Sequence, residues 1–152
     1  NANVGSVKAA IDLLASFSGY RVFVFGDMGE LGDQAAMYHT QIGDYAQEHG
    51  IDTLISSGEL SAYASRAMAK NGIECSDATE AFNALIRKVY PLVSEPNSNA
   101  KAGLSSSSKK VPVTILVKGS RSARMEQVVD AVMAFDFNQG DDGLIDNQME
   151  HA

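Results

Sequence analysis

Apolar positions recur along the chain at two spacings, which alternate from one segment to the next. Short unbroken apolar runs indicate buried strands, because a strand of a parallel sheet is covered on both faces. Apolar residues three and four positions apart indicate helices with one buried side. The runs predict strands over 21–25, 53–55, 73–75 and 113–117. The helical spacing predicts helices over 6–17, around Tyr38, Ile42 and Tyr45, over 61–70, from Asp77 to Val89, and around Met125, Val128, Val129, Val132 and Met133.

Turn and capping signals mark the ends of these segments. Gly50 follows the second helical stretch as a stop signal. Asp77 and Glu80 have the spacing of a capping box, with Asp in place of the usual Ser or Thr. Residues 91–111 hold two prolines, a serine run and a lysine pair, which predicts a solvated polar insertion before the last strand.

Strands that alternate with helices predict one α/β domain over residues 1–135. Its expected architecture is three layers, a mainly parallel sheet with helices on both faces. Ligands of such sheets bind beyond the carboxyl ends of the strands. Two loops with unusual chemistry leave strands at that end, residues 26–32 and residues 118–121. Because parallel strands end at the same edge of a sheet, we expect these two loops to form one site.

The loop over residues 118–121 indicates an anion site. A strand, a Gly-Ser turn and a helix start place free backbone N–H groups and the positive end of a helix dipole at one point. Lys118, Arg121 and Arg124 add cationic side chains there, in a chain with a formal net charge of −7. The anion is either a carboxylate or a phosphate. The alternative is a basic helix start whose side chains form surface ion pairs.

The loop over residues 26–32 is rich in glycine but does not match a nucleotide-binding fingerprint. Its glycines are three apart, whereas the dinucleotide fingerprint has its first two glycines two apart. Asp27 and Glu30 would also place negative charge beside a pyrophosphate. A phosphate loop needs Gly-Lys before Ser or Thr, and none of the 13 glycines is followed by Lys.

Histidine and cysteine positions show no metal-binding or nucleophile motif. The three histidines are scattered and there is no cysteine pair, so we predict no metal site. His39, near the start of the second helix, is either a functional residue or a histidine satisfied in the core or at the surface. The single cysteine, Cys75, excludes an internal disulfide and fits a reducing cytoplasm. Beside a short strand, it is expected to be a small buried hydrophobe.

Charge is unevenly distributed along the chain. Residues 136–152 hold five acidic residues and no Lys or Arg, which predicts a disordered acidic tail. Removing those five charges takes the net charge from −7 to −2. The rest is therefore near neutral, and nucleic-acid binding is not expected. No window approaches the ~20 apolar residues of a membrane span, and the N-terminus shows no signal peptide. We expect a cytoplasmic monomer without a membrane span.

Several motifs occur in a fixed order along the chain. They are Asn1-Ala2-Asn3-Val4-Gly5-Ser6, Gly26-Asp27-Met28-Gly29-Glu30-Leu31-Gly32, His39, Gly43 and Val117-Lys118-Gly119-Ser120-Arg121-Ser122. Together they resemble the C-terminal domain of the Mur ligase family, and within it the ligases that add D-alanyl-D-alanine. The likeness runs from residue 1 to about residue 133, interrupted by the insertion. Many family members have Pro where Val4 stands.

The resemblance implies the third, Rossmann-like domain of a three-domain enzyme. In that family the first domain binds the UDP-sugar peptide, and the central domain holds the ATP phosphate loop and the Mg²⁺ ligands. The implied reaction is ATP-dependent amide formation in peptidoglycan precursor synthesis. The carboxylate of UDP-N-acetylmuramoyl-tripeptide takes the γ-phosphate of ATP, the amino group of D-alanyl-D-alanine attacks the acyl phosphate, and phosphate leaves. Charge stabilisation is the expected catalytic term.

The resemblance also implies which residues bind ligands. By this resemblance Asn1 and Asn3 would lie near the adenosine of ATP. An asparagine amide suits the edge of adenine, since it both donates and accepts hydrogen bonds. The residues that would contact substrate are Lys118, Ser120, Arg121, Asp27, Glu30 and His39. Arg121 suits a carboxylate, which it can bind as a fork. Asp27 and Glu30 either hold the ammonium group of the dipeptide or order their loop.

No catalytic residue is expected in this chain by itself. ATP and Mg²⁺ would be held mainly by the central domain, so the isolated chain is expected to be inactive. The alternative from a different functional class is a non-catalytic α/β module that binds a small anion or a nucleotide.

Overall fold

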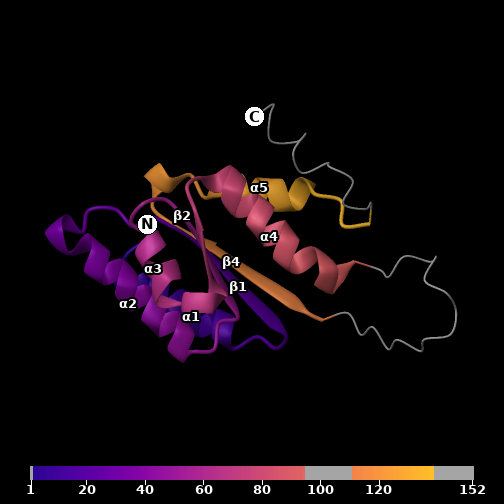
Figure 1. The fold of residues 1–152 in the computed structure, drawn as a ribbon, viewed down its shortest axis with the longest axis horizontal. Coiled ribbons are helices and arrows are strands. Elements are labelled where there is room, and N and C mark those ends of the chain that lie inside the picture. The colour runs from indigo at the N-terminus through magenta and orange to yellow at the C-terminus, as the bar shows by residue number, and fades with distance from the viewer. Residues whose placement is uncertain (1, 95–110, 139–152) are drawn as a thin grey trace, which may run out of the picture.

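The computed structural model describes residues 2–94 and 111–138, and Figure 1 shows its helices and strands. The helices are α1 (Val4–Ala15), α2 (Ala35–Glu48), α3 (Ala62–Ala67), α4 (Ala78–Val93) and α5 (Glu126–Ala134). The strands are β1 (Tyr20–Gly26), β2 (Thr53–Ser57), β3 (Gly72–Cys75) and β4 (Val113–Lys118). Three short 3-10 turns are η1 (Gly32–Gln34), η2 (Ala69–Asn71) and η3 (Arg121–Ala123).

The four strands form one parallel sheet in the order β3-β2-β1-β4. From β1 the chain moves outward through β2 to β3, and α4 then carries it back to β4 on the other side of β1. The direction of winding therefore reverses between β1 and β4, and their carboxyl ends lie side by side, with Phe25 level with Lys118. The predicted α/β class with a parallel sheet is confirmed, and the reversal marks the place where such sheets bind ligands.

Alternating side chains of the strands bury two separate cores. Phe23 and Phe25 of β1 pack against α1, α2 and α3, whereas Val22 and Val24 pack against α4 and α5. Six large apolar side chains of β1 and β2 have no exposed surface (Val22, Phe23, Val24, Phe25, Leu54, Ile55). The result is the predicted three-layer arrangement, visible in Figure 1 as helices on both sides of the sheet.

Two helices end three or more residues away from the predicted position, and α1 lies about two residues earlier than predicted. α4 continues through Pro91 to Val93, because a proline in the last turn gives up only one backbone hydrogen bond and keeps a helical φ. The third helix stops after Ala67, since Ala69 adopts a left-handed φ of 51° and redirects the chain into η2. The predicted insertion therefore starts after Val93 at the earliest. Residues 95–110 and the predicted disordered part of the tail from 139 lie outside the described residues.

The predicted apolar face of α5 is only partly buried. Met125 and Val128 are buried against the sheet, but Val129 is 43% exposed and Met133 is 82% exposed. α5 covers the sheet with one narrow stripe, so the neighbouring stripe faces outward. No helix in the described part of the chain is long and apolar enough to cross a membrane.

Candidate ligand-binding site

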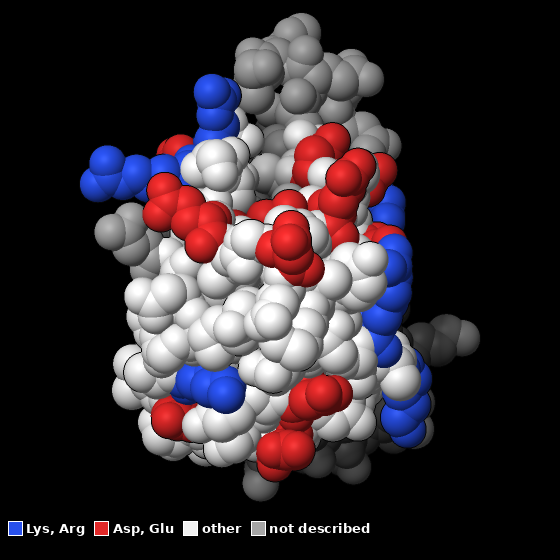
Figure 2. Space-filling view, turned by 90° about the vertical axis from the view of Figure 1, so that its left-hand side faces the viewer, with Lys and Arg blue, Asp and Glu red and all other residues white. Residues whose placement is uncertain are grey.

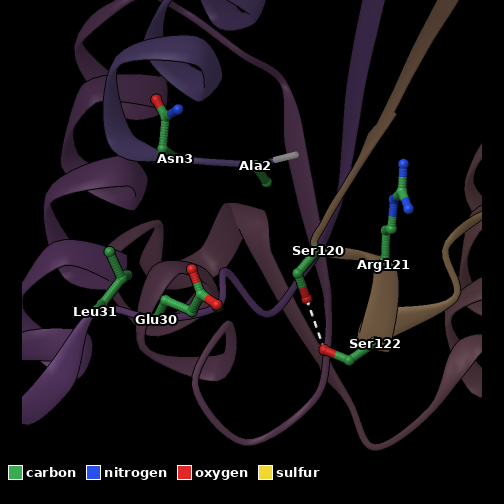
Figure 3. Close-up of a pocket in the computed structure, with 8 residues that line it drawn as sticks. Ala2, Asn3, Glu30, Leu31, Ser120, Arg121 and Ser122 are labelled. Carbon is green, nitrogen blue, oxygen red and sulfur yellow. Dashed lines mark hydrogen bonds between the residues drawn. The ribbon is translucent and has the colours of Figure 1, made fainter.

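A cavity of about 520 Å³ opens at the carboxyl edge of the sheet, where the winding reverses. Three segments far apart in sequence surround it, and Figure 3 shows the residues that they contribute. They are Ala2 and Asn3 before α1, Gly29, Glu30 and Leu31 after β1, and Ser120, Arg121 and Ser122 after β4. The two loops thus lie together and line one cavity, as expected for parallel strands that end at the same edge.

A direct backbone contact joins the two loops. The N–H of Ser120 donates to the carbonyl oxygen of Asp27 at 2.9 Å, which continues the β1–β4 pairing beyond the strand ends. A Cβ atom on Gly119 would lie 2.7 Å from Cγ of Met125 and 3.1 Å from Cα of Gly26. These glycines therefore allow close packing of the two strand ends and η3.

The carboxylate of Asp27 orders a third loop. Its Oδ1 accepts from the N–H of Ser61 at 2.7 Å, and its Oδ2 accepts from the N–H of Leu60 at 3.3 Å. Both donors belong to the connection between β2 and α3. These bonds support the loop-ordering role, one of the two that the sequence left open, because each carboxylate oxygen already accepts one backbone N–H.

His39 is fully buried and lies behind the cavity. Its Nε2 atom accepts from the N–H of Met28 at 2.9 Å, and its Nδ1 atom lies 2.7 Å from the carbonyl oxygen of Ala35. The ring packs against Phe25, with centroids 5.6 Å apart. Both nitrogens are therefore engaged with backbone and none of the ring reaches the surface. The structure supports the core-histidine alternative, and direct contact with substrate would require the loop to move.

Glu30 is the acidic residue of the loop that faces the cavity. It is exposed, and its backbone adopts a left-handed φ of 59°, which residues other than glycine rarely do. Figure 3 shows its carboxylate directed toward the turn that carries Ser120 and Ser122. Arg124, just beyond that turn, has a φ of 51°. Two strained residues thus flank the site, which is a feature of functional loops.

The cationic side chains of the second loop form no ion pair with the described residues. The ion pairs found there join Arg21 to Asp52 and Arg66 to Glu74, and the ring of His49 lies 3.7 Å from Asp12. Lys118 is half-buried and Arg121 is exposed. The described residues therefore do not support the alternative, in which surface ion pairs hold this basic turn. The face in Figure 2 carries charges of both signs around a largely uncharged centre.

The local backbone around Arg121 differs from the prediction. Arg121 begins the 3-10 turn η3, and α5 starts only at Glu126. The N–H of Ser120 is already bonded to Asp27, and the hydroxyls of Ser120 and Ser122 lie 2.9 Å apart. The predicted helix start is therefore a 3-10 turn, and one of the amides expected to be free, that of Ser120, already has a partner. The cationic side chains at this turn belong to Lys118 and Arg121.

Asn3 caps the first helix beside the cavity. Its Oδ1 accepts from the N–H of Ser6 at 2.8 Å, and the Ser6 hydroxyl accepts from the N–H of Asn3 at 3.1 Å. The cap fixes the side chain and turns its amide oxygen toward the helix, so the amide nitrogen is the atom left to donate. Asn1 lies outside the described residues, and so does the prediction made for it.

Sequence reasoning missed two parts of this edge. Ser122 lines the main cavity, and a second cavity of about 370 Å³ lies beside it, between Asp27, Arg124 and the start of α4. Ser122 could have been found from its place in the motif after β4. The second cavity is lined in part by the β2–α3 connection, whose sequence has no distinctive motif. No group of three or more His, Cys, Asp or Glu suited to a metal ion occurs among the residues that the structure describes.

Comparison with known proteins gives matches over most of the chain. A family model described as Mur ligase, glutamate ligase domain, matches residues 1–121. The UDP-N-acetylmuramoyl-tripeptide–D-alanyl-D-alanine ligase of Escherichia coli (strain K12) is 42% identical over 132 residues, covering 87% of this chain and 25% of that protein. The chain thus spans about a quarter of the length of this relative.

Solved structures give the same result for the fold. A crystal structure of MurF from Acinetobacter baumannii superposes with a TM-score of 0.72 at 27% identity, covering 89% of this chain and 26% of that one. The MurF ligase from Thermotoga maritima, solved in complex with ADP, superposes with a TM-score of 0.63 at 22% identity over 86% of this chain and 25% of that one. The second likeness shows the fold alone.

Proposed function

Because this chain belongs to the Mur ligase family, we propose that it is the C-terminal domain of an ATP-dependent ligase that adds D-alanyl-D-alanine to UDP-N-acetylmuramoyl-tripeptide. The observation that carries the proposal is the 42% identity over 87% of the chain to a ligase named for that reaction. The cavity between the two loops supports it, since it offers both cationic and acidic side chains to a substrate with a carboxylate and an ammonium group.

Most of the ATP site belongs to the rest of the protein in this proposal. The chain has no Gly-Lys phosphate loop and matches about a quarter of its relatives. ATP supplies the phosphoryl group that activates the tripeptide carboxylate, with Mg²⁺ held outside this chain. Asn1 and Asn3 are placed beside the adenosine, where the amide nitrogen of Asn3 donates. The isolated chain should therefore not catalyse ligation.

Arg121 and Lys118 are the residues that we assign to an anionic group of the substrate. Arg121 lines the cavity, Lys118 ends the strand β4 just before it, and neither forms an ion pair among the described residues. The guanidinium of Arg121 can bind the terminal carboxylate of the dipeptide as a fork, and the hydroxyl of Ser120 can add a hydrogen bond. A charged hydrogen bond of this kind is worth roughly 1.5–3 kcal/mol.

Glu30 is the residue that we assign to the ammonium group of the incoming dipeptide. Its carboxylate is exposed at the cavity, whereas the carboxylate of Asp27 is occupied by two backbone N–H groups. An amine must lose a proton before it attacks an activated carboxyl group. A carboxylate beside it orients the ammonium form and accepts a hydrogen bond from it.

The proposed reaction places the enzyme in peptidoglycan precursor synthesis, and therefore in cell-wall growth and division. Its UDP-linked substrate is soluble, so we place the enzyme in the cytoplasm, and we expect it to act as a monomer. Closure of this domain over the central domain would exclude the water that otherwise hydrolyses an acyl phosphate.

The test is a ligation assay with the full-length protein that carries this chain. With UDP-tripeptide, D-alanyl-D-alanine, ATP and Mg²⁺, we expect release of phosphate and a product whose mass has grown by the dipeptide. The 152-residue chain alone should give neither. Binding of small anions without ligation by the full-length protein would instead support the non-catalytic module.

A further inference from the structure

We propose that His39 is a positioning residue that holds the loop over residues 27–32 through one tautomer of its neutral ring. Glu30 lies on this loop and lines the cavity. The imidazole of His39, on α2, accepts a hydrogen bond from the backbone of the loop at Met28. The kinetic part of this inference rests on the proposed function, but the geometry that leads to it does not.

The hydrogen bonds of His39 define the tautomer. The backbone N–H of Met28 can only donate, so the Nε2 atom that it meets at 2.9 Å must carry a lone pair and no proton. The proton of the neutral ring therefore sits on Nδ1, which donates to the carbonyl oxygen of Ala35 at 2.7 Å. A doubly protonated ring would direct an N–H at the N–H of Met28, and the other neutral tautomer would do the same.

The surroundings of the ring allow no substitute partner. Its side chain has no exposed surface, and Met28 beside it is 2% exposed, so water does not replace a lost bond. The titratable groups on the adjoining segments are Asp27, Glu30 and Asp33 on the loop and η1, and Tyr38 on α2. No hydrogen bond or ion pair in the described structure joins any of them to the imidazole.

The other anchors near the tip of the loop are apolar: Met28 is buried in the core with α1, α2 and α3, and Leu31 packs against that core. Asp27 is fixed on both sides by backbone contacts, to Ser120 through its carbonyl and to Ser61 through its carboxylate. Beyond Asp27, Met28 is held by His39, and Glu30 then turns through its left-handed φ of 59°. Loss of the His39 bond should therefore release Glu30 while leaving Asp27 in place.

The test compares three substitutions in the full-length ligase. His39→Gln keeps an acceptor at about the position of Nε2, His39→Asn keeps only a group near Nδ1, and His39→Leu keeps neither. We expect kcat/KM for D-alanyl-D-alanine to fall about 10- to 100-fold in the Asn and Leu variants. The Gln variant should recover most of that loss, with the effect concentrated in KM.

His49 provides the matched control on the same helix. Its Nδ1 atom also meets the carbonyl oxygen four residues earlier, at 2.8 Å, but the residue lies at the far end of α2. His49→Asn should leave kcat/KM within about twofold of the wild type. Melting temperatures of all variants separate a loss of fold from a loss of loop position.

Histidine-labelled protein gives a readout that does not depend on activity. Two-bond ¹H–¹⁵N correlations of the imidazole ring should show His39 as the neutral tautomer protonated on Nδ1. A ring protonated on Nε2 would overturn the proposal, and so would Asn and Leu variants with wild-type kcat/KM in an active ligase. Equal losses in the Gln and Asn variants would also overturn it. If the wild type does not ligate, the proposed function fails, and the spectrum still decides the tautomer.

Discussion

Arginine side chains stand at both edges of the sheet, and their surroundings differ. At the amino edge, the guanidinium of Arg21 donates to the carbonyl oxygens of Ala15 at 2.9 Å and Gly50 at 2.5 Å, and its Nε lies 3.6 Å from Asp52. It thus ties together the ends of α1 and α2. At the carboxyl edge, Arg121 is exposed beside a cavity and has no ion-pair partner among the described residues.

The difference separates charge that builds the fold from charge that remains available for a ligand. A cation whose donors are used by carbonyl oxygens gains stability from the protein itself. A cation beside a cavity gains little until an anion arrives, so its effect should appear in kinetics. Substitutions at the two edges should therefore have opposite profiles, large in stability at one edge and large in catalysis at the other.

The largest stability effect is expected from Arg21→Ala. It removes two hydrogen bonds from a charged donor and leaves Asp52 and two helix-end carbonyls without that partner. We expect the free energy of unfolding to fall by about 2–4 kcal/mol. At temperatures where the protein stays folded, ligation kinetics should be unchanged. Chemical denaturation checks the first expectation, and an initial-rate assay checks the second. An altered KM with unchanged stability in Arg21→Ala would contradict the proposed difference between the two edges.

A smaller stability effect is expected from Gly119→Ala, which should affect both properties. The added Cβ would lie 2.7 Å from Cγ of Met125, and the neighbouring contact with Gly26 limits how far the chain can shift. Overpacking of this kind costs about 1–3 kcal/mol and would displace η3 together with Arg121. Gly29→Ala is the matched control, because its Cβ would meet only Ser120, at 3.7 Å. Equal melting temperatures for the two variants would argue against close packing at the strand ends.

The smallest effect is expected at the start of α4. The N–H of Ser76 donates to the carboxylate of Glu80 at 2.8 Å, and this bond lowers the pKa of Glu80 below its usual 4.5. A lowered carboxyl pKa gives stability that is present above about pH 4.5 and lost as pH falls through the folded-state pKa. Glu80→Gln should flatten this part of the pH–stability curve, and Glu59→Gln should not. If stability still falls with pH to the same extent in Glu80→Gln, the loss of stability in acid comes from other carboxylates.

The sequence predicted the fold because the fold follows from periodicity. The five predicted helices and four predicted strands all occur close to their predicted positions. Because apolar runs alternate with helical spacing along the chain, the sequence also predicted a parallel sheet. Errors arose where one residue decided a boundary, as at Ala69 and Pro91. The capping box at Asp77 was half right: Asp77 accepts from the N–H of Glu80, but Glu80 reaches back to Ser76.

The candidate site was predicted in place but only partly in detail. The two loops meet because parallel strands end together, a property that sequence order already contains. The carboxylate of Asp27 accepts from the β2–α3 connection, and His39 bonds to backbone atoms of Met28 and Ala35. No sequence motif predicts these partners. The turn at Arg121 was taken for a helix start, since residue types alone do not distinguish a 3-10 turn from the first turn of a helix.

The central claim is that Arg121 serves the substrate and not the fold. The measurement that tests it most directly is steady-state kinetics of Arg121→Ala in the full-length enzyme, with D-alanyl-D-alanine as the varied substrate and a thermal melt beside it. Arg121→Lys keeps the charge without the fork, and Arg87→Ala, an exposed position on α4, is the control.

We expect Arg121→Ala to lower kcat/KM about 10- to 100-fold, as loss of a charged hydrogen bond of roughly 1.5–3 kcal/mol implies. Arg121→Lys should recover part of that loss, and the melting temperatures of all variants should match the wild type. Wild-type kinetics in Arg121→Ala would contradict the account, because the cationic turn at the carboxyl edge would then have no role toward the substrate.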